Sequence, residues 1–376
     1  MAEDDHCRSW LGTHANEHHE LFLIMSYNIL ADANARNHSK DLSEHIPALI
    51  TDWEARKASL LQELQLYLPD VICLQEVDQF RDFEAELQKV GYSGVYKKRT
   101  GASRDGCAMF WREERFELLE EENIEFKDYQ LRDNVGQVCA LGSKYGSREN
   151  RVVIGNVHVM FNPLRGEVKL GQARVLLEKV HSMSGKWGDV PVVIAGDFNS
   201  TPWSPMYQFL SSSYLDLVGL NRRCISGQED DGECESKRSK NKASQCLRKS
   251  AGVSRKRNSV PNKVKGWDPF ELLAATGNRN LSVVQHKLKL RSVYSEIEGK
   301  PSSRDARGEP FVTTFHRMFK GTVDYIWHNE GLCAVRVLDT PPTSVLVRDK
   351  GMPSKRWRSD HLALACELSF VPKKDT

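Results

Sequence analysis

The fold is decided by one stretch of the sequence, Pro191-Val-Val-Ile-Ala-Gly-Asp-Phe-Asn-Ser-Thr-Pro-Trp203. Its first residues form a short apolar run rich in β-branched side chains, which is the composition of a strand buried on both faces. The run stops at Gly196, and Asp197 and Asn199 follow at once. In α/β folds, a buried strand that ends in polar side chains presents chemistry at the edge of a sheet. An Asx-type turn uses the same residue types, so the rest of the chain must decide between the two interpretations.

The same pattern recurs along the chain, because several apolar, strand-like runs are followed by a side chain that can bind a metal ion or a phosphate. Between these runs lie amphipathic segments with helical spacing, notably residues 52–68 and 166–182. Strands that alternate with helices predict a layered α/β structure. The polar residues at strand ends are Asn28, Glu76, His158, Asp197, Asn199, Asp324, Asp360 and His361.

This residue set favours one kind of chemistry if the strands bring it to a common sheet edge. Carboxylates and amides without cysteine suit a hard, oxygen-preferring cation such as Mg²⁺ or Mn²⁺. Neutral Asn and His side chains beside the acids can donate hydrogen bonds to a phosphate that carboxylates alone would repel. Metal-assisted hydrolysis of a phosphoester needs a Lewis acid, an activated water and donors for the charged transition state. The set therefore predicts such a hydrolase.

The composition is that of a globular protein with a large core, since 40% of the 376 residues are hydrophobic and 28% are charged. No apolar run reaches the length of a membrane span, so we expect no membrane contact. The acidic N-terminus lacks the features of a secretory signal, and we expect a cytoplasmic protein. The net charge is +2, but residues 222–265 hold 13 Lys and Arg against 5 Asp and Glu, which leaves the rest mildly acidic.

We expect a single catalytic domain over residues 20–372, preceded by a disordered leader at residues 1–19. Residues 222–265 are dominated by Ser, Lys, Arg and Asn without a hydrophobic period, which predicts a basic, disordered insertion. Within it, Arg255-Lys-Arg257 suits a nuclear import signal or an RNA-contacting arm, so a nuclear location stays open beside the cytoplasmic one. A solvated loop without a specific role explains the same residues.

A second basic segment is Lys97-Lys-Arg-Thr-Gly101, which lies between two strand-like runs. Its charges and its glycine suit contact with a phosphate backbone, and we assign Arg99 to substrate binding on this ground. A solvated hairpin tip is an equally good interpretation of this segment.

Five short motifs resemble, in their order, the endonuclease/exonuclease/phosphatase superfamily. They are Tyr27-Asn28, Leu74-Gln-Glu76-Val, Gly196-Asp197-Phe-Asn199-Ser, Val323-Asp324-Tyr-Ile and Ser359-Asp360-His361. Each is weak alone, but five in order across residues 24–370 are a strong indication. Two further stretches, Asn156-Val-His158-Val-Met-Phe-Asn162-Pro163 and Phe319-Lys-Gly-Thr-Val-Asp324, are similar to the carbon catabolite repressor protein 4 group of poly(A) nucleases. Within it, the chain resembles the plant members without leucine-rich repeats, with Angel proteins and nocturnin as sister branches.

The resemblance implies a DNase I-like, four-layer α/β sandwich, in which two mixed β-sheets lie face to face with helices outside. It also implies roles for the matched residues, with Mg²⁺ (or Mn²⁺) as the cofactor. These roles are metal binding for Glu76, Asn28 and Asp360, catalysis for Asp197, Asn199, His158, His361 and its orienting Asp324, and substrate binding for Asn162, Pro163 and Phe319. A flat apolar clamp of Pro163 and Phe319 is suited to stack a terminal adenine.

The activity that the resemblance implies is that of a Mg²⁺-dependent 3′-5′ exoribonuclease, a deadenylase that shortens poly(A) tails and releases AMP. Leu164-Arg-Gly-Glu167 resembles the Angel branch instead, so a phosphatase that acts on RNA 2′,3′-cyclic phosphate ends or on a nucleotide is the alternative. A non-catalytic RNA-binding relative is a third, which the presence of every matched residue disfavours. RNA is the expected partner, whereas docking to a deadenylase scaffold complex would need a surface other than leucine-rich repeats.

Overall fold

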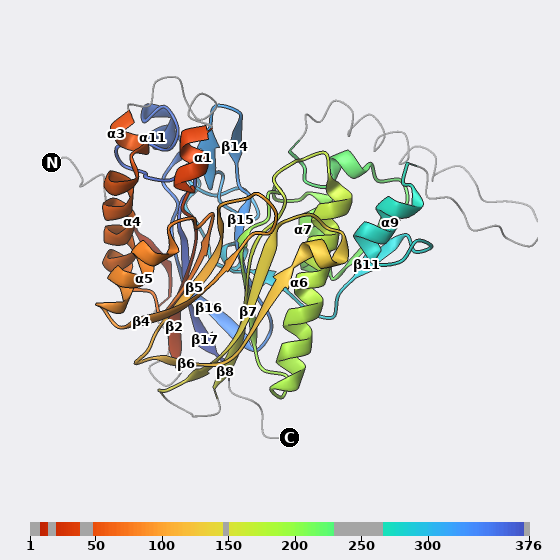
Figure 1. The fold of residues 1–376 in the computed structure, drawn as a ribbon, viewed down its shortest axis with the longest axis horizontal. Helices are drawn as coiled ribbons and strands as arrows, with labels where there is room; N and C mark the ends of the chain where they lie inside the picture. The colour runs from red at the N-terminus through yellow and green to blue at the C-terminus, as the bar shows by residue number, and fades with distance from the viewer. Residues whose placement is uncertain (1–7, 14–19, 38–47, 146–149, 229–265, 372–376) are drawn as a thin grey trace, which may run out of the picture.

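The computed structural model describes residues 8–13, 20–37, 48–145, 150–228 and 266–371. They form two large mixed β-sheets that face each other, with helices on both outer faces (Figure 1). The expected four-layer α/β sandwich is therefore confirmed. Most of the predicted leader and insertion, including Arg255-Lys-Arg257, lies outside the described residues.

The first sheet has seven strands, and only its neighbours β2 and β3 run parallel. Its strand order is β1 (Trp10–Gly12), β16 (Leu332–Leu338), β17 (Leu364–Phe370), β2 (Leu21–Asn28), β3 (Val71–Gln75), β5 (Gly106–Arg112) and β4 (Tyr92–Lys98). Helices α4 (Trp53–Tyr67) and α5 (Phe80–Gln88) cover its outer face.

The second sheet has six strands, and only its neighbours β8 and β9 run parallel. Its strand order is β12 (Arg291–Ser292), β15 (Asp324–His328), β9 (Val192–Asp197), β8 (Arg151–His158), β7 (Val135–Ser143) and β6 (Phe116–Glu125). Helices α6 (Gly166–Lys186), α7 (Pro205–Ser212) and α9 (Pro269–Thr276) lie on its outer face.

Shorter elements complete the described chain. Two small hairpins pair β10 (Tyr214–Asp216) with β11 (Val283–Gln285) and β13 (Thr314–His316) with β14 (Phe319–Gly321). The remaining helices are α1 (Asp32–Asn37), α3 (Ala48–Thr51), α10 (Val293–Glu296), α11 (Thr343–Arg348), and the 3₁₀ turns η1 (Phe126–Tyr129) and η2 (Arg222–Cys224).

Three apolar clusters hold the four layers together. The middle cluster lies between the sheets, where Ile24 and Val71 of the first sheet meet Ile154 and Val193 of the second. Burial of each such side chain contributes about 1.5–3 kcal/mol, so the sandwich is stabilised mainly by this packing. The rigid layers fix the positions of the strand ends.

The helix predicted over residues 52–68 is observed as α4, and its ends explain its length. Asp52 is the N-cap, because its side chain accepts a hydrogen bond from the backbone N–H of Ala55. At the other end Leu68 adopts a left-handed conformation with φ of 47° and donates its N–H to the carbonyl of Leu64. Pro69 follows, and a proline N cannot continue the helix.

The prediction of disorder is wrong at two places, and the sequence analysis missed several strands, among them β6, β10, β11 and β12. Trp10–Gly12 of the predicted leader form β1, which pairs with β16. Arg222–Cys224, at the start of the predicted insertion, form η2, and the Ile225 side chain that follows is fully buried. The longest of the missed strands is β6, in which many acidic residues lie around the buried Phe116 and Ile124. Isolated apolar residues in polar segments show no period, so local patterns do not reveal them.

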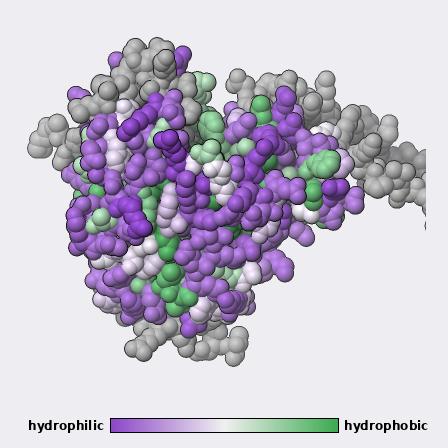
Figure 2. Space-filling model, in the orientation of Figure 1, coloured by the Kyte–Doolittle hydropathy of each residue, from purple (hydrophilic) through white to green (hydrophobic). Residues whose placement is uncertain are grey.

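The surface in the orientation of Figure 1 is mostly hydrophilic (Figure 2). Hydrophobic side chains gather there in a narrow central band and in a small patch over α9, where Phe270 is exposed. Among the helices of the described residues, none is both long enough and apolar enough to cross a membrane.

Candidate active site

Four strand ends carry polar side chains to one edge of the sandwich. In the first sheet β2 ends at Asn28. In the second sheet His158, the last residue of β8, lies beside Asp197, the last residue of β9. Asp324 opens β15 and stands directly opposite Asp197, because β15 runs antiparallel to β9. The two facing sheets thus deliver these side chains to a shared site.

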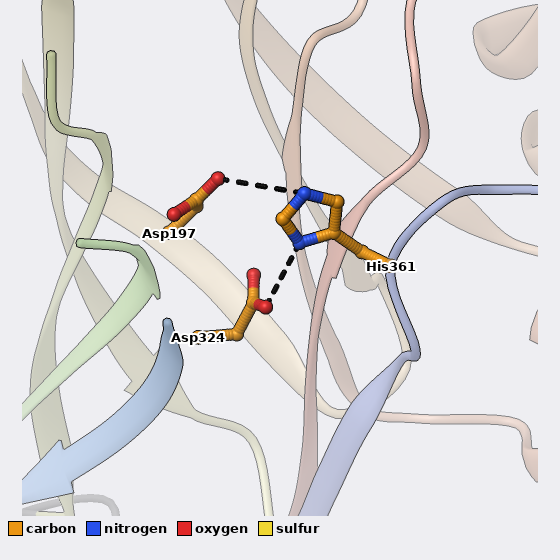
Figure 3. A group of neighbouring side chains, drawn as sticks. All are labelled: Asp197, Asp324 and His361. Atoms are coloured by element: carbon orange, nitrogen blue, oxygen red, sulfur yellow. Dashed lines mark hydrogen bonds and ion pairs between the residues drawn. The ribbon is translucent and has the colours of Figure 1, made fainter. Parts of the chain in front are cut away.

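The centre of the site is a chain of three side chains, Asp197, His361 and Asp324 (Figure 3). Nδ1 of His361 lies 2.9 Å from Oδ2 of Asp324, and Nε2 of the same ring lies 3.8 Å from Oδ2 of Asp197. Thr313 donates its hydroxyl to the same Asp324 oxygen at 2.6 Å. Asp324 therefore holds the imidazole by Nδ1 and turns Nε2 toward Asp197.

The electrostatics of this centre favour proton transfer near neutral pH. Burial, and after it the neighbouring Asp324, raise the pKa of Asp197 to about 7, against the opposing effects of His361 and of hydrogen bonds from Asn199 and Asn28. Burial alone would lower the pKa of His361, but Asp324 and the other acids outweigh it and raise that pKa well above its ordinary value. A carboxylate with a pKa near 7 is suited to accept a proton from water.

Glu76 follows β3 and is held from three directions. Its Oε1 accepts a hydrogen bond from Nδ2 of Asn28 at 3.2 Å, and its Oε2 accepts from Nδ2 of Asn34 at 2.7 Å and from the N–H of Ala31 at 3.2 Å. Asn28 also donates to Oδ2 of Asp197 at 3.1 Å, so its amide joins the acids of the two sheets. The backbone of Glu76 has a φ of 56°, a left-handed conformation that costs free energy and clusters at functional sites.

Asp360 brings a further acid to the same side of the site. The hydroxyl of the preceding Ser359 donates to the carbonyl of Asn28 at 2.6 Å, which fastens this segment to the end of β2. The negative charge of Asp360 acts on both Arg56 and His361, as their pKa shifts reflect. Asp360 is therefore placed among the charged groups of the site.

The donors on this side fit a hard divalent cation, because Glu76, Asp360 and Asn28 offer carboxylate and amide oxygens. Asp197, Asp324 and His361 also lie close together, with one potential ligand atom of each within 4.8 Å of the others. In that group, however, His361 and Asp324 hydrogen-bond to each other. We therefore interpret Asp324 and His361 as a proton-handling pair and Glu76 with Asp360 as the metal side.

His158 and Arg99 lie on the other flank of Asp197. Nε2 of His158 is 3.5 Å from Oδ2 of Asp197, while its buried Nδ1 has no hydrogen-bond partner among the described residues. Burial, and then the positive charge of Arg99, lower the pKa of His158 to about 4. His158 is therefore neutral at physiological pH and suited to donate to a phosphate without adding charge. Arg99 is held near it by Asp105, at 3.5 Å.

Asn199 is fixed by its own loop. Its N–H donates to Oδ1 of Asp197 at 2.8 Å, and its side-chain Nδ2 donates to the carbonyl of Val159 at 3.0 Å. Its φ is 47°, so a second residue at this site adopts the left-handed conformation. The amide of Asn199 thus joins the loops that follow β8 and β9.

Lys169 supports these loops, and the sequence analysis missed it. It is fully buried in α6, where its Nζ donates to the carbonyl of Asn199 at 2.7 Å and to that of Phe161 at 3.3 Å. Burial lowers the pKa of Lys169 to about 7, with only Asp197 acting in the other direction. The sequence held an indication, because Lys169 stands on the same helical stripe as the apolar Ala173 and Leu176.

The predicted substrate-binding residues border the site on two segments. Asn162 and Pro163 lie in the loop after β8, where Oδ1 of the exposed Asn162 accepts the N–H of Leu164 at 2.9 Å. Phe319 opens β14, and its ring covers Gly321, where a Cβ atom would lie 2.8 Å from the ring. Both apolar side chains, of Pro163 and Phe319, are half-buried, which leaves part of each for a ligand.

Two buried polar side chains, Arg56 and Gln75, stabilise the segments around the site by hydrogen bonds, and the sequence analysis assigned neither a role. Arg56 of α4 donates to the backbone carbonyls of Ile29, Leu30 and Arg358, which ties the loop after Asn28 to the segment before Asp360. Between the sheets, Gln75 donates to Asn156 at 2.8 Å. Because buried polar side chains need such partners, they fix the sheets in one arrangement.

The fold and the site together define the DNase I-like class of phosphoester hydrolases. The fold is two facing mixed sheets, and the site combines an acid suited to bind a metal, Glu76, with the hydrogen-bonded pair of Asp324 and His361. The chain belongs to the Endonuclease/Exonuclease/phosphatase family, whose sequence model matches residues 25–361. The resemblance seen in the five motifs is thereby confirmed. Enzymes of this family typically depend on a divalent metal.

Curated relatives narrow the similarity. Carbon catabolite repressor protein 4 homolog 5 of Arabidopsis thaliana is 46% identical and covers 93% of this chain and 77% of its own length. Homolog 3 of the same plant is 41% identical and covers 97% of this chain and 79% of its own length. Protein angel homolog 2 of Bos taurus is 32% identical over 92% and 69%. The chain is thus similar along most of its length to members of both branches.

Solved structures give the same picture. The crystal structure of ANGEL2, a 2′,3′-cyclic phosphatase, in complex with adenosine-2′,3′-vanadate superposes with a TM-score of 0.76 at 30% identity, over 96% of this chain and 98% of that one. The human nocturnin catalytic domain superposes with a TM-score of 0.58 at 22% identity, over 97% and 98%. At this level of identity the nocturnin match supports the fold alone.

Proposed function

We propose that the protein is a Mg²⁺-dependent 3′-5′ exoribonuclease that shortens poly(A) and releases AMP. The observation that carries the proposal is the convergence of Glu76, Asp197 and His361 at one sheet edge, beside segments that present Pro163 and Phe319. The first group suits phosphoester hydrolysis, and the second suits the stacking of a base. Similarity to the carbon catabolite repressor protein 4 homologues supports a nucleic-acid substrate.

Glu76 and Asp360, with Asn28, would hold Mg²⁺, which supplies Lewis-acid charge for the phosphate oxygens when bound. Asp197 accepts the proton of the attacking water at Oδ2, the oxygen that faces His158 and His361. The water oxygen bonds to phosphorus, the bond from phosphorus to the 3′-oxygen of the preceding nucleotide breaks, and that oxygen takes a proton from solvent water. The products are AMP and an RNA shortened by one nucleotide.

The protonated His361 and the neutral His158 stabilise the charge that builds up on the phosphate oxygens. Asp324 keeps Nδ1 of His361 occupied, so Nε2–H is the donor that faces the site. His158 adds a donor without repelling the metal side, since its pKa is lowered to about 4. Preorganised donors of this kind typically supply a factor of about 10²–10³ in rate each.

A second activity uses the same residues, namely removal of a 2′,3′-cyclic phosphate from an RNA end. The observation that favours it is the similarity to ANGEL2, a 2′,3′-cyclic phosphatase, with a TM-score of 0.76. Leu164-Arg-Gly-Glu167 follows Pro163 and runs from the loop after β8 into the start of α6, where Arg165 pairs with Glu167. The two activities differ in product, so a product analysis separates them.

The test uses two RNAs with Mg²⁺, one ending in oligo(A) with a 3′-hydroxyl and one ending in a 2′,3′-cyclic phosphate. Wild type is compared with Glu76→Gln, which removes the charge but keeps the shape, and with Glu86→Gln, a matched change of a surface acid in α5. Stepwise AMP release that is lost only in Glu76→Gln is the expected result. Phosphate removal without shortening would assign the second activity, and neither product would overturn both.

A further inference from the structure

The β13–β14 hairpin carries a histidine to which the mechanism above gives no role. His316 ends β13 and pairs in register with Phe319, which opens β14. The centroids of the two rings lie 6.5 Å apart. His316 is therefore a neighbour of the side chain proposed to stack the terminal adenine.

The same hairpin is fastened to the segment that carries Asp360 and His361. Thr314 forms an isolated β-bridge with His361, and its hydroxyl donates to the carbonyl of Asp360 at 2.8 Å. The N–H of Phe315 donates to the same carbonyl at 3.3 Å. The strand that ends in His316 thus begins at Thr314, which pairs with His361. Side chains two residues apart on a strand lie on the same face, so His316 lies on the same face of the strand as Thr314.

The ring of His316 has one nitrogen available to a ligand. The N–H of Met318 donates to Nδ1 at 3.2 Å, so Nδ1 is an acceptor and the proton of the neutral ring sits on Nε2. Nowhere in the described part of the chain does a group hydrogen-bond to Nε2. Burial lowers the pKa of His316, while Asp360 raises it and His361 lowers it further, so the ring is within reach of the charges of the site.

The ribose of a nucleotide links its base to its phosphate. If the base stacks on Phe319 and the phosphate lies at His361, the ribose therefore lies between these two residues. His316 stands in this interval, next to Phe319 and two residues from the bridge at Thr314. The hydrogen-bonding group that distinguishes a ribose from a deoxyribose is the 2′-hydroxyl. We propose that Nε2–H of His316 donates to the 2′-hydroxyl of the 3′-terminal nucleotide and makes the enzyme select RNA over DNA ends.

This inference rests on the proposed exonuclease function and specifies which residue makes that activity selective for ribose over deoxyribose. The experiment measures release of the terminal nucleotide in a single turnover from two oligo(A) RNAs that differ in one atom, since one ends in adenosine and the other in 2′-deoxyadenosine. Wild type should release AMP roughly tenfold faster than dAMP, the effect of one hydrogen bond.

Three variants sharpen the test. His316→Leu keeps most of the volume but has no donor, so its AMP to dAMP rate ratio should fall to about one. His316→Gln retains an amide donor and should keep part of the preference. Met318→Ala, at the exposed tip of the same hairpin, should keep the wild-type ratio. A purely structural role for His316 would slow both substrates equally and leave the ratio unchanged.

An unchanged ratio in folded His316→Leu, with AMP still released, would overturn this inference and leave the proposed function standing. A wild-type ratio near one would overturn it whether or not His316→Leu folds. Failure of the wild type to release AMP from oligo(A) would overturn the proposed function, and this inference with it.

Discussion

Two of the clusters of buried charged side chains among the described residues are built in opposite ways. In the candidate active site, Asp197 and Asp324 are direct cross-strand partners, an arrangement of like charges that destabilises a sheet. At the edge near β16, the buried Arg304 donates to Asp339 at 3.1 Å and lies over the ring of Tyr294. Here opposite charges meet. The comparison indicates which cluster serves folding and which serves chemistry.

The pKa of Asp197 expresses this difference. A carboxylate whose pKa is raised on folding contributes stability that is present below its ordinary pKa and lost as the pH rises through the raised value, about 7 for Asp197. At pH 8 the ionised Asp197 therefore lowers the free energy of unfolding. Strongly shifted pKa values cluster at functional sites, so this shift supports the catalytic role proposed for Asp197.

The largest effect on chemistry is expected from His361→Gln. The variant loses the imidazolium between Asp197 and Asp324, so we expect nucleotide release per folded molecule to slow by about 10²–10³. The matched control is His286→Gln, a change of a histidine that bonds backbone carbonyls of α7 and lies outside the site. Release rates for both variants check the prediction. If nucleotide release slowed equally in both variants, His361 would have no role in the reaction beyond that of any buried histidine.

The converse change is Asp339→Ala in the other cluster. It leaves the buried guanidinium of Arg304 without its carboxylate, so the free energy of unfolding should fall by about 3 kcal/mol, while turnover per folded molecule is unchanged. Denaturant unfolding measures the loss, and Glu54→Ala, which breaks an exposed pair with Lys57, should cost well under about 1 kcal/mol. A loss as small as that of the control would show that the Asp339 pair is not a stabilising contact.

Lys169→Met tests a buried charge whose hydrogen bonds, among the described residues, go to backbone carbonyls and not to a carboxylate. Methionine fills a similar volume without a charge to bury, so stability should be kept or raised. The loops of Asn199 and Phe161 lose their common donor, and we expect turnover to fall about tenfold through misplacement of Asn199. Steady-state kinetics should show the loss in kcat more than in KM. Unchanged kcat would mean that the loops hold their positions without Lys169.

The smallest effect concerns Glu309, a buried acid that accepts the hydroxyl of Tyr207 at 2.7 Å. Burial raises its pKa to about 7, so its stabilising contribution is present at low pH and is lost as the pH rises through 7. Glu309→Gln keeps an acceptor but does not titrate. Between pH 6 and 8 its free energy of unfolding should fall by about 1 kcal/mol less than that of wild type. Parallel pH profiles of the two proteins would contradict this.

Much of this site could be predicted from the sequence, because its parts are local. A polar residue directly after an apolar strand can be recognised without a structure, as at Asn28, Glu76 and Asp197. The metal and catalytic roles of these residues are predictions that rest on the family resemblance. The fold class followed from the alternation of strands and helices together with that resemblance.

The remaining features depend on packing between distant segments. The position of Lys169 on the apolar stripe of its helix indicates burial, but only the approach of two loops gives its ammonium group carbonyl partners. Arg56 likewise lies in a helix, yet it bonds carbonyls of two remote segments. His316 is a further example, because no local pattern shows that its strand forms a bridge, through Thr314, with His361. Such contacts are set by tertiary structure rather than by local pattern.

The most direct test of the central claim is to measure Asp197→Asn at pH 8 both for unfolding and for nucleotide release. Because the change removes a like charge opposite Asp324, the free energy of unfolding should equal or exceed that of wild type. Release should slow by about 10²–10³, since the proton acceptor is lost. A variant that is less stable than wild type but releases nucleotide at the wild-type rate would show that Asp197 is a structural residue and would contradict the account.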